Sequence, residues 1–136
     1  MLQYMLDTDT VSYALRGDER IISMILEHAP SELCVSAVTV SELRYGAARR
    51  KSKRLAGLID AFTRGLAVVA FDEFCAHHYG DIAADLEKRR APIGQLDVMI
   101  AAHAMALDIA LVTNNTKHFR RVRGLKIENW ATASGL

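Results

Sequence analysis

Three carboxylates are the side chains of this 136-residue sequence whose setting points most directly to chemistry. Asp7 lies in YMLDTDT, Glu42 in TVSELRYGA and Asp97 in GQLDVMIAAHA. Each stands where an apolar run meets a helix-like segment, and in a parallel α/β fold such junctions gather at one edge of the sheet. Carboxylate oxygens gathered there would suit a hard divalent cation, Mg²⁺ or Mn²⁺. The three acids therefore predict metal-assisted hydrolysis of phosphodiester bonds.

Each acid also has a purely structural interpretation. Asp7 and Asp97 are good N-caps for the helices that follow them. Thr39 and Glu42 have the spacing of a capping box, with Thr39 as N-cap. Taken singly, these interpretations are the stronger ones, but they do not explain why three such acids occur together. Clustered carboxylates raise one another's pKa, and a bound cation would remove that cost.

Other polar residues near the same junctions have open roles. Asp9 is either an extra ligand or a first-turn helix acid. Asn114 and Asn115 follow an apolar run. One interpretation is that they contact a phosphate or a metal-bound water, for which Asn115 is the better candidate. The other is that they shape a turn. His118 is the one histidine with a candidate functional position. The hydroxyls of Thr8, Ser41 and Thr113 are weaker candidates for hydrogen bonds to the carboxylates.

Positive charge is concentrated in two zones although the net charge is only +1. Residues 43–59 hold six basic side chains and no acid, and residues 109–127 hold five and again no acid. Basic zones beside an acidic site suit a polyanionic substrate. The residues that we expect to contact RNA are Arg44, Arg49, Lys117 and Arg120. The alternative is a solvated helix face and a charged turn.

Apolar runs alternate with helical patterns throughout the sequence, which predicts a parallel sheet of about five strands flanked by helices. The predicted strands are residues 2–6, 33–38, 66–71, 110–113 and 126–128. The predicted helices are residues 10–16, 20–28, 39–50, 55–64, 74–90 and 96–107, with a turn and short helix at 114–121. We expect one domain over residues 1–136, because there is no linker or repeat.

Several other classes of protein lack support in the sequence. There is no P-loop, dinucleotide-binding glycine motif, nucleophile elbow or zinc-type spacing of Cys and His. We see neither a signal peptide nor a membrane span, and we expect a cytoplasmic protein. Cys34 and Cys75 lie in apolar settings, where two buried thiols are a better interpretation than a disulfide.

Five stretches together resemble the PIN-domain ribonucleases, and more closely the VapC toxins of bacterial toxin–antitoxin pairs. The matching stretches are MLDTDT at 5–10, VSELRYGA at 40–47, PIGQLDVMIAAHA at 92–104, LVTNNTKHF at 111–119 and GLKIENW at 124–130. The resemblance implies a PIN-like fold and an Mg²⁺- or Mn²⁺-dependent endoribonuclease. The acids of the first three stretches would be the metal ligands, which correspond to Asp7, Glu42 and Asp97 here.

The chain departs from the family pattern at three places. Asp9 stands where the family usually has Asn, Asn114 and Asn115 lie where many members add a fourth acid, and His118 stands where some relatives carry an acid. These departures put a second metal ion in doubt. The resemblance also implies a homodimer, a small VapB-like antitoxin that covers the active site, and an RNA substrate such as the anticodon region of a tRNA, notably the initiator tRNA.

Two alternatives from other functional classes remain at this point. A phospho-receiver signalling domain also has a five-stranded parallel sheet, clustered acids and Mg²⁺, although no single phosphoacceptor Asp is evident at the end of the third strand. A catalytically inactive RNA-binding module would need the basic zones only, and the intact set of three acids argues against it.

Overall fold

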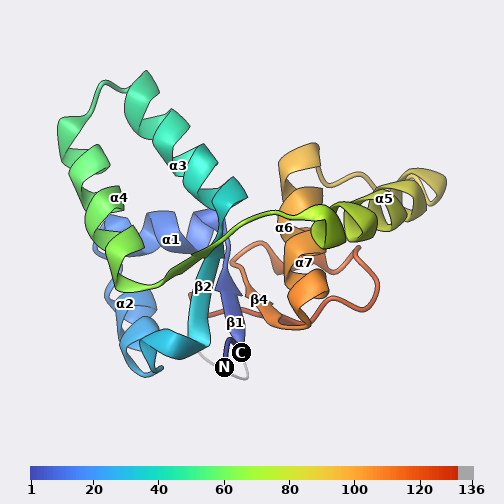
Figure 1. The fold of residues 1–136 in the computed structure, drawn as a ribbon, viewed down its shortest axis with the longest axis horizontal. Coiled ribbons are helices and arrows are strands. Elements are labelled where there is room, and N and C mark those ends of the chain that lie inside the picture. Colours follow the sequence, from blue (N-terminus) through green and yellow to red (C-terminus); the bar gives the residue numbers. More distant parts are fainter. Residues whose placement is uncertain (132–136) are drawn as a thin grey trace.

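The computed structural model, which describes residues 1–131, has a five-stranded parallel sheet in the order β3-β2-β1-β4-β5 (Figure 1). The strands are β1 (Tyr4–Leu6), β2 (Leu33–Ser36), β3 (Ala67–Val69), β4 (Ala110–Val112) and β5 (Ile127–Glu128). The helices are α1 (Thr8–Leu15), α2 (Glu19–Leu26), η1 (Pro30–Glu32, a 3₁₀ turn), α3 (Ala37–Arg49), α4 (Lys53–Gly65), α5 (Glu73–Lys88), α6 (Gln95–Leu107) and α7 (Thr116–Phe119). The predicted fold class is confirmed.

Two apolar clusters hold the helices against the sheet. One joins α5, α6 and α7 to the strands and includes Met5, Ile100 and Phe119. The other joins α1 to α4 to the strands and includes Leu6 and Ile59. Neighbouring residues of one strand thus face opposite clusters, as the period of two in a strand requires. This explains why the short central strands are apolar along their whole length.

The strand order places a reversal point beside β1. The chain runs outward from β1 through β2 to β3, then returns to the other side of β1 with β4 and β5. In open α/β sheets, ligands bind in the crevice where the strand order reverses, at the carboxyl ends of the strands. In this protein that crevice lies at the end of β1, immediately before Asp7.

The predicted capping box at the start of α3 is wrong. The N-cap is Ser36, whose hydroxyl accepts a hydrogen bond from the backbone N–H of Val38 at 3.0 Å. The helix therefore begins at Ala37, and the second strand ends two residues earlier than predicted. Glu42 consequently lies in the second turn of α3, where its side chain is not needed to cap the helix. The other predicted elements are present with shifts of up to two residues at their ends.

The helix α6, which carries Asp97, is tied to α3 through the core. Its fully buried His103 has Nδ1 2.7 Å from Ser36 Oγ, the same oxygen that caps α3. This histidine belongs to the core, and its Nε2 has no hydrogen-bond partner within residues 1–131. Cys34 and Cys75 are buried free thiols, as predicted.

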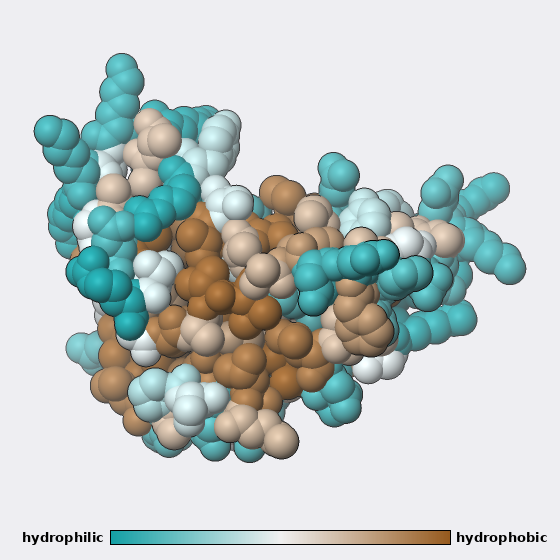
Figure 2. All heavy atoms as spheres, in the orientation of Figure 1, coloured by the Kyte–Doolittle hydropathy of each residue, from teal (hydrophilic) through white to brown (hydrophobic). Residues whose placement is uncertain are grey.

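The two helical arms, α1 to α4 and α5 to α7, lie on either side of the central strands, and the surface is hollowed between them (Figures 1 and 2). Apolar side chains gather on the middle of the face shown in Figure 2, while polar side chains cover the outer ends of both arms. Val68 and Phe74 are among the large apolar side chains that remain exposed. Among the described residues, no helix is long and apolar enough to cross a membrane.

Candidate active site

Asp7 is fixed where β1 passes into α1. It is the N-cap of α1, and its Oδ1 accepts a hydrogen bond from the backbone N–H of Thr10 at 2.8 Å. The backbone N–H of Asp7 donates to the Val112 carbonyl of β4, so the residue still belongs to the sheet edge. The capping interpretation of Asp7 is thus correct. It does not exclude a site role, because an N-cap uses one oxygen and a carboxylate has two.

Glu42 reaches the same edge from α3. The hydroxyl of Thr8 donates to Glu42 Oε1 at 2.6 Å, and the hydroxyls of Thr8 and Thr39 lie 3.3 Å apart. A residue in the first turn of α1 therefore holds the acid of α3. Of the three hydroxyls predicted as carboxylate partners, Thr8 is confirmed for Glu42 and Thr113 for Asp7. The prediction for Ser41 is wrong, because its hydroxyl donates to the Ala37 carbonyl within its own helix.

Asp97 lies in the first turn of α6, whose N-cap is Gly94 and not Asp97. Gly94 has a φ of 95°, a conformation that other residues rarely adopt, and it turns the chain into the helix. The Oδ2 of Asp97 is 3.1 Å from Nε2 of His118, and the same nitrogen is 2.5 Å from the Ile93 carbonyl oxygen. Because a carbonyl only accepts, Nε2 must carry a hydrogen. In this tautomer His118 presents to Asp97 the N–H that it shares with the Ile93 carbonyl.

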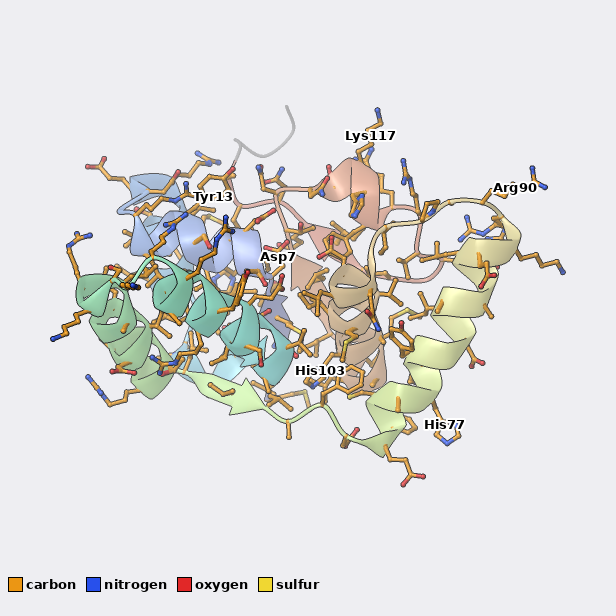
Figure 3. The ribbon with its side chains drawn as sticks, turned by 90° about the horizontal axis from the view of Figure 1, so that it is seen from above. Asp7, Tyr13, His77, Arg90, His103 and Lys117 are labelled. Carbon is orange, nitrogen blue, oxygen red and sulfur yellow. The ribbon has the colours of Figure 1, made fainter. Side chains whose placement is uncertain are left out.

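These acids line one polar cavity of about 230 Å³ at the carboxyl edge of the sheet. The lining residues are Asp7, Thr8, Asp9, Glu42, Asp97, Asn115 and Phe119. Figure 3 shows Asp7 between the helices of the two arms, at the centre of the molecule. The structure thus brings the three predicted acids together, with Asp9 as a fourth and Asn115 beside them.

The electrostatics of the cavity oppose full ionisation. Burial raises the pKa of Asp7 to about 6, although hydrogen bonds from Thr113 and Thr10 oppose the shift. Burial also raises the pKa of Glu42 and of Asp97; the Thr8 hydrogen bond opposes the first shift, and His118 opposes the second. The negative charge of Asp9 raises the pKa of all three. A divalent cation would reverse each of these penalties.

The donor set has the chemistry that a hard cation prefers, namely carboxylate oxygens and an amide. Within residues 1–131, however, no three acidic, histidine or cysteine side chains already stand in an arrangement that would enclose an ion. Glu42 is turned to Thr8 and Asp97 to His118. The residues present therefore fit a metal site by type and by position, and their side chains would have to rotate to complete it.

The predicted RNA contacts differ in how available they are. Arg44 is tied to Asp60 of α4 by an ion pair of 2.5 Å. Arg49, Lys117 and Arg120 are exposed, and Lys117 extends outward from α7 (Figure 3). Asn114 does not line the cavity; its amide donates to the Tyr13 hydroxyl at 3.2 Å. The sequence did not predict that bond, because Tyr13 lies outside the motifs and 101 positions from Asn114.

Comparison with known proteins agrees with this geometry. The PIN domain family matches residues 4–125. Ribonuclease VapC2 of Haemophilus influenzae is 40% identical over 132 residues, which covers 96% of this chain and 99% of that protein. The tRNA(fMet)-specific endonuclease VapC of Salmonella typhimurium is 35% identical over 131 residues, again 96% and 99% of the two chains.

Solved structures give the same result. The fold matches a chain in the crystal structure of VapBC2 from Rickettsia felis bound to a promoter DNA fragment, with a TM-score of 0.89 and 32% identity over 95% of this chain and 99% of that one. It matches a chain of DNA-bound VapBC from Salmonella typhimurium with a TM-score of 0.89 and 36% identity, over 96% and 99%.

The fold and the acidic cavity define a nuclease of the PIN type. The chain belongs to the PIN-domain family and, within it, to the VapC ribonucleases of toxin–antitoxin systems.

Proposed function

We propose that this VapC ribonuclease is an Mg²⁺- or Mn²⁺-dependent endoribonuclease in which Asp7, Glu42 and Asp97 are the metal ligands. The observation that carries the proposal is that three helix starts, far apart in the sequence, bring these acids into one polar cavity. Burial raises the pKa of all three acids, and a divalent cation would offset that cost. A bound divalent cation would activate a water molecule and stabilise the charge that develops on the phosphate.

The protein's own residues have definite parts in this scheme. Asp7 is held at the start of α1 by the bond from the Thr10 N–H to its Oδ1, which leaves its other oxygen for the metal. His118 and Thr8 hold the other two acids at the rim of the cavity. Asn115 is exposed at the same rim and offers a neutral amide that can orient the water or the scissile phosphate. No side-chain nucleophile is required.

The alternatives are less well supported. A phospho-receiver domain of the flavodoxin type has the strand order 2-1-3-4-5, whereas this sheet has the order β3-β2-β1-β4-β5. An inactive RNA-binding module would have no use for four carboxylates in one cavity, because they would repel the phosphate backbone.

The test is cleavage of RNA by the purified protein with Mn²⁺, with Mg²⁺ and with EDTA. The Asp97→Asn variant serves as the matched control, because it removes a charge at a rim position without removing a helix cap. We expect cleavage with either cation and none with EDTA or with the variant. Cleavage in EDTA at the same rate would contradict the metal dependence.

For the substrate we propose the initiator tRNA, because a relative with 35% identity over nearly the whole chain is named as a tRNA(fMet)-specific endonuclease. The family resemblance implies that the cut falls in the anticodon region. Incubation with total tRNA, followed by mapping of the new ends, tests this. Initiator tRNA should be cut within the anticodon stem and loop, and equal cutting of all tRNAs and of an unstructured RNA would contradict it.

We also propose an antitoxin partner that inhibits the enzyme by covering this cavity. Several solved relatives are toxin–antitoxin complexes. Four carboxylates and one imidazole leave an excess of negative charge, which an arginine of the partner would neutralise. Coexpression with the cognate antitoxin should yield a complex that does not cleave RNA. Full activity of that complex would contradict the proposal.

The expected homodimer stays a prediction, which sedimentation of the free protein can test.

A further inference from the structure

A second cavity lies directly beside the acidic one, between α1 and α3. It has a volume of about 200 Å³ and shares two wall residues with the acidic cavity, Thr8 and Glu42. The hydroxyl of Ser12 and two arginines, Arg16 and Arg50, provide its other polar groups. Leucines of α1, α3 and α4 line the rest. Glu42 is its one acidic wall residue, so the second cavity has the opposite charge character to the first.

Both arginines are available to a ligand. Arg16 is the C-cap of α1, with its Nε 3.3 Å from the Ser12 carbonyl and its guanidinium 5.0 Å from the centre of the Tyr13 ring. Arg50 is the C-cap of α3. Neither forms an ion pair with a carboxylate of residues 1–131, whereas Arg44 and Arg89 do. The ring contact and the Nε bond of Arg16 restrict its side chain, and its two terminal nitrogens make no hydrogen bond to residues 1–131.

We propose that this cavity is a subsite for an RNA phosphate next to the phosphate that is cleaved. The inference rests on the proposed function, because it takes the acidic cavity as the place of cleavage. A guanidinium presents paired N–H donors that match two phosphate oxygens, and two arginines and a serine in the wall of one cavity suit one phosphate group. The leucines would contact the apolar edge of the adjoining ribose.

The subsite addresses an electrostatic difficulty of the active site. Four acids repel an approaching RNA backbone, and a cation in the acidic cavity offsets this at the scissile phosphate only. Arg16 and Arg50 would offset it one position along the RNA strand, because they line the cavity that shares Glu42 with the acidic cavity. The RNA strand would therefore cross the wall that Thr8 and Glu42 form between the two cavities, with one phosphate in each cavity.

Experiment can separate RNA binding from two alternative roles of these arginines. Each stands at a helix C-terminus, where a positive charge stabilises the helix in any case. An acidic side chain of the antitoxin would also fit the cavity. A purely stabilising role predicts a loss of stability without a change in RNA affinity, and a contact with the antitoxin predicts a loss of antitoxin affinity alone.

The test compares Arg16→Ala, Arg50→Ala and the double variant with Arg64→Ala. Arg64 is an exposed arginine in the last turn of α4 that lines neither cavity, so it is a matched control for charge and for helix position. Binding of a fluorescent single-stranded oligoribonucleotide is measured by anisotropy over a range of salt concentrations, with Asp97→Asn present in every protein so that the RNA stays intact. Cleavage is measured separately without that change.

Each arginine variant should raise the Kd for RNA by about tenfold, as loss of a charge-assisted hydrogen bond does. Each should also lower the slope of log Kd against log salt by about 0.7, the value for one lost contact to single-stranded RNA. In the cleavage assay KM should rise more than kcat falls, and Arg50→Lys should recover part of the affinity. Arg64→Ala should match the parent protein.

An equal loss of affinity in Arg64→Ala would overturn the subsite, because it would reveal a general effect of net charge. Unchanged RNA affinity with weakened antitoxin binding would overturn it in favour of a partner contact. RNA binding that depends on Arg16 and Arg50 in a protein that cleaves no RNA would support the subsite while contradicting the proposed activity. The two hypotheses can therefore fail separately.

Discussion

Replacing Asp7 by Asn should abolish cleavage and yet stabilise the metal-free protein. Asp7 is only 3% exposed, and burial raises its pKa from 3.8 to about 6. At pH 7.5 it must be ionised in the folded state, although the fold favours its protonated form. A shift of about 2 pKa units corresponds to about 3 kcal/mol of lost stability. Asparagine removes the charge and keeps an oxygen for the Thr10 N–H, and Asn is as good an N-cap as Asp.

The pH dependence follows from the direction of the shift. Because the folded pKa is the higher one, the cost of ionising Asp7 is absent below the unfolded pKa and complete above the folded pKa. The free energy of unfolding of Asp7→Asn should therefore exceed that of the wild type by up to about 3 kcal/mol at pH 7.5 and by about half as much at pH 5.

Urea unfolding of the metal-free proteins, followed by circular dichroism at the two pH values, measures this difference. Asp18→Asn is the matched control, because Asp18 caps α2 in the same way, with the Ile21 N–H 3.1 Å from its Oδ1, but lies away from the cavity. Its effect should stay within about 0.5 kcal/mol. Mn²⁺ should reverse the order by stabilising the wild type more than the variant. If Asp7→Asn were no more stable than the wild type at pH 7.5, the argument from burial would be refuted.

Three further predictions concern the chemistry and the support of the site. Cleavage should leave a 5′-phosphate and a 3′-hydroxyl, since water is the expected nucleophile and Nε2 of His118 is a donor; a 2′,3′-cyclic phosphate in end-group analysis would contradict this. Calorimetric titration of the RNA-free protein with Mn²⁺ should give a stoichiometry near one per chain, and Asn115→Asp should add a second, weaker site; two equal sites in the wild type would count against this. Ser36→Ala should destabilise the protein by about 1–3 kcal/mol, because it removes the cap of α3 and leaves His103 without its partner. Chemical denaturation measures that loss, which a change below about 0.5 kcal/mol would argue against.

The order of elements, the parallel sheet and the three acids could be predicted from the sequence because they depend on local signals. Apolar runs of strand length alternate with helical spacing, and each acid lies beside such a run. Their approach to one edge follows from the rule that connections between parallel strands place all the carboxyl ends together. The family resemblance added the reaction, and the comparisons confirm the family and the ribonuclease activity.

Helix starts were harder to predict, because several residues near a helix start can cap it and only packing selects one. Thr39 and Glu42 have a valid capping spacing, yet Ser36 caps α3, since its hydroxyl also meets His103 of α6 across the core. That contact joins residues 67 positions apart, and no local pattern encodes it. Thr39 is instead fully buried within the helix.

The surroundings of the acids were decided by the tertiary structure alone. The sequence supplied four carboxylates, but their neighbours are brought close only in the folded chain. These neighbours bury Asp7, and they include Thr8 at Glu42 and His118 at Asp97. The same holds for the basic side chains. Arg44 lies in a basic run but is paired with Asp60, whereas Arg16 of α1 and Arg50 of α3 line one cavity. A sequence determines which charges are present, and packing determines their distances, partners and exposure to water, on which their chemistry depends.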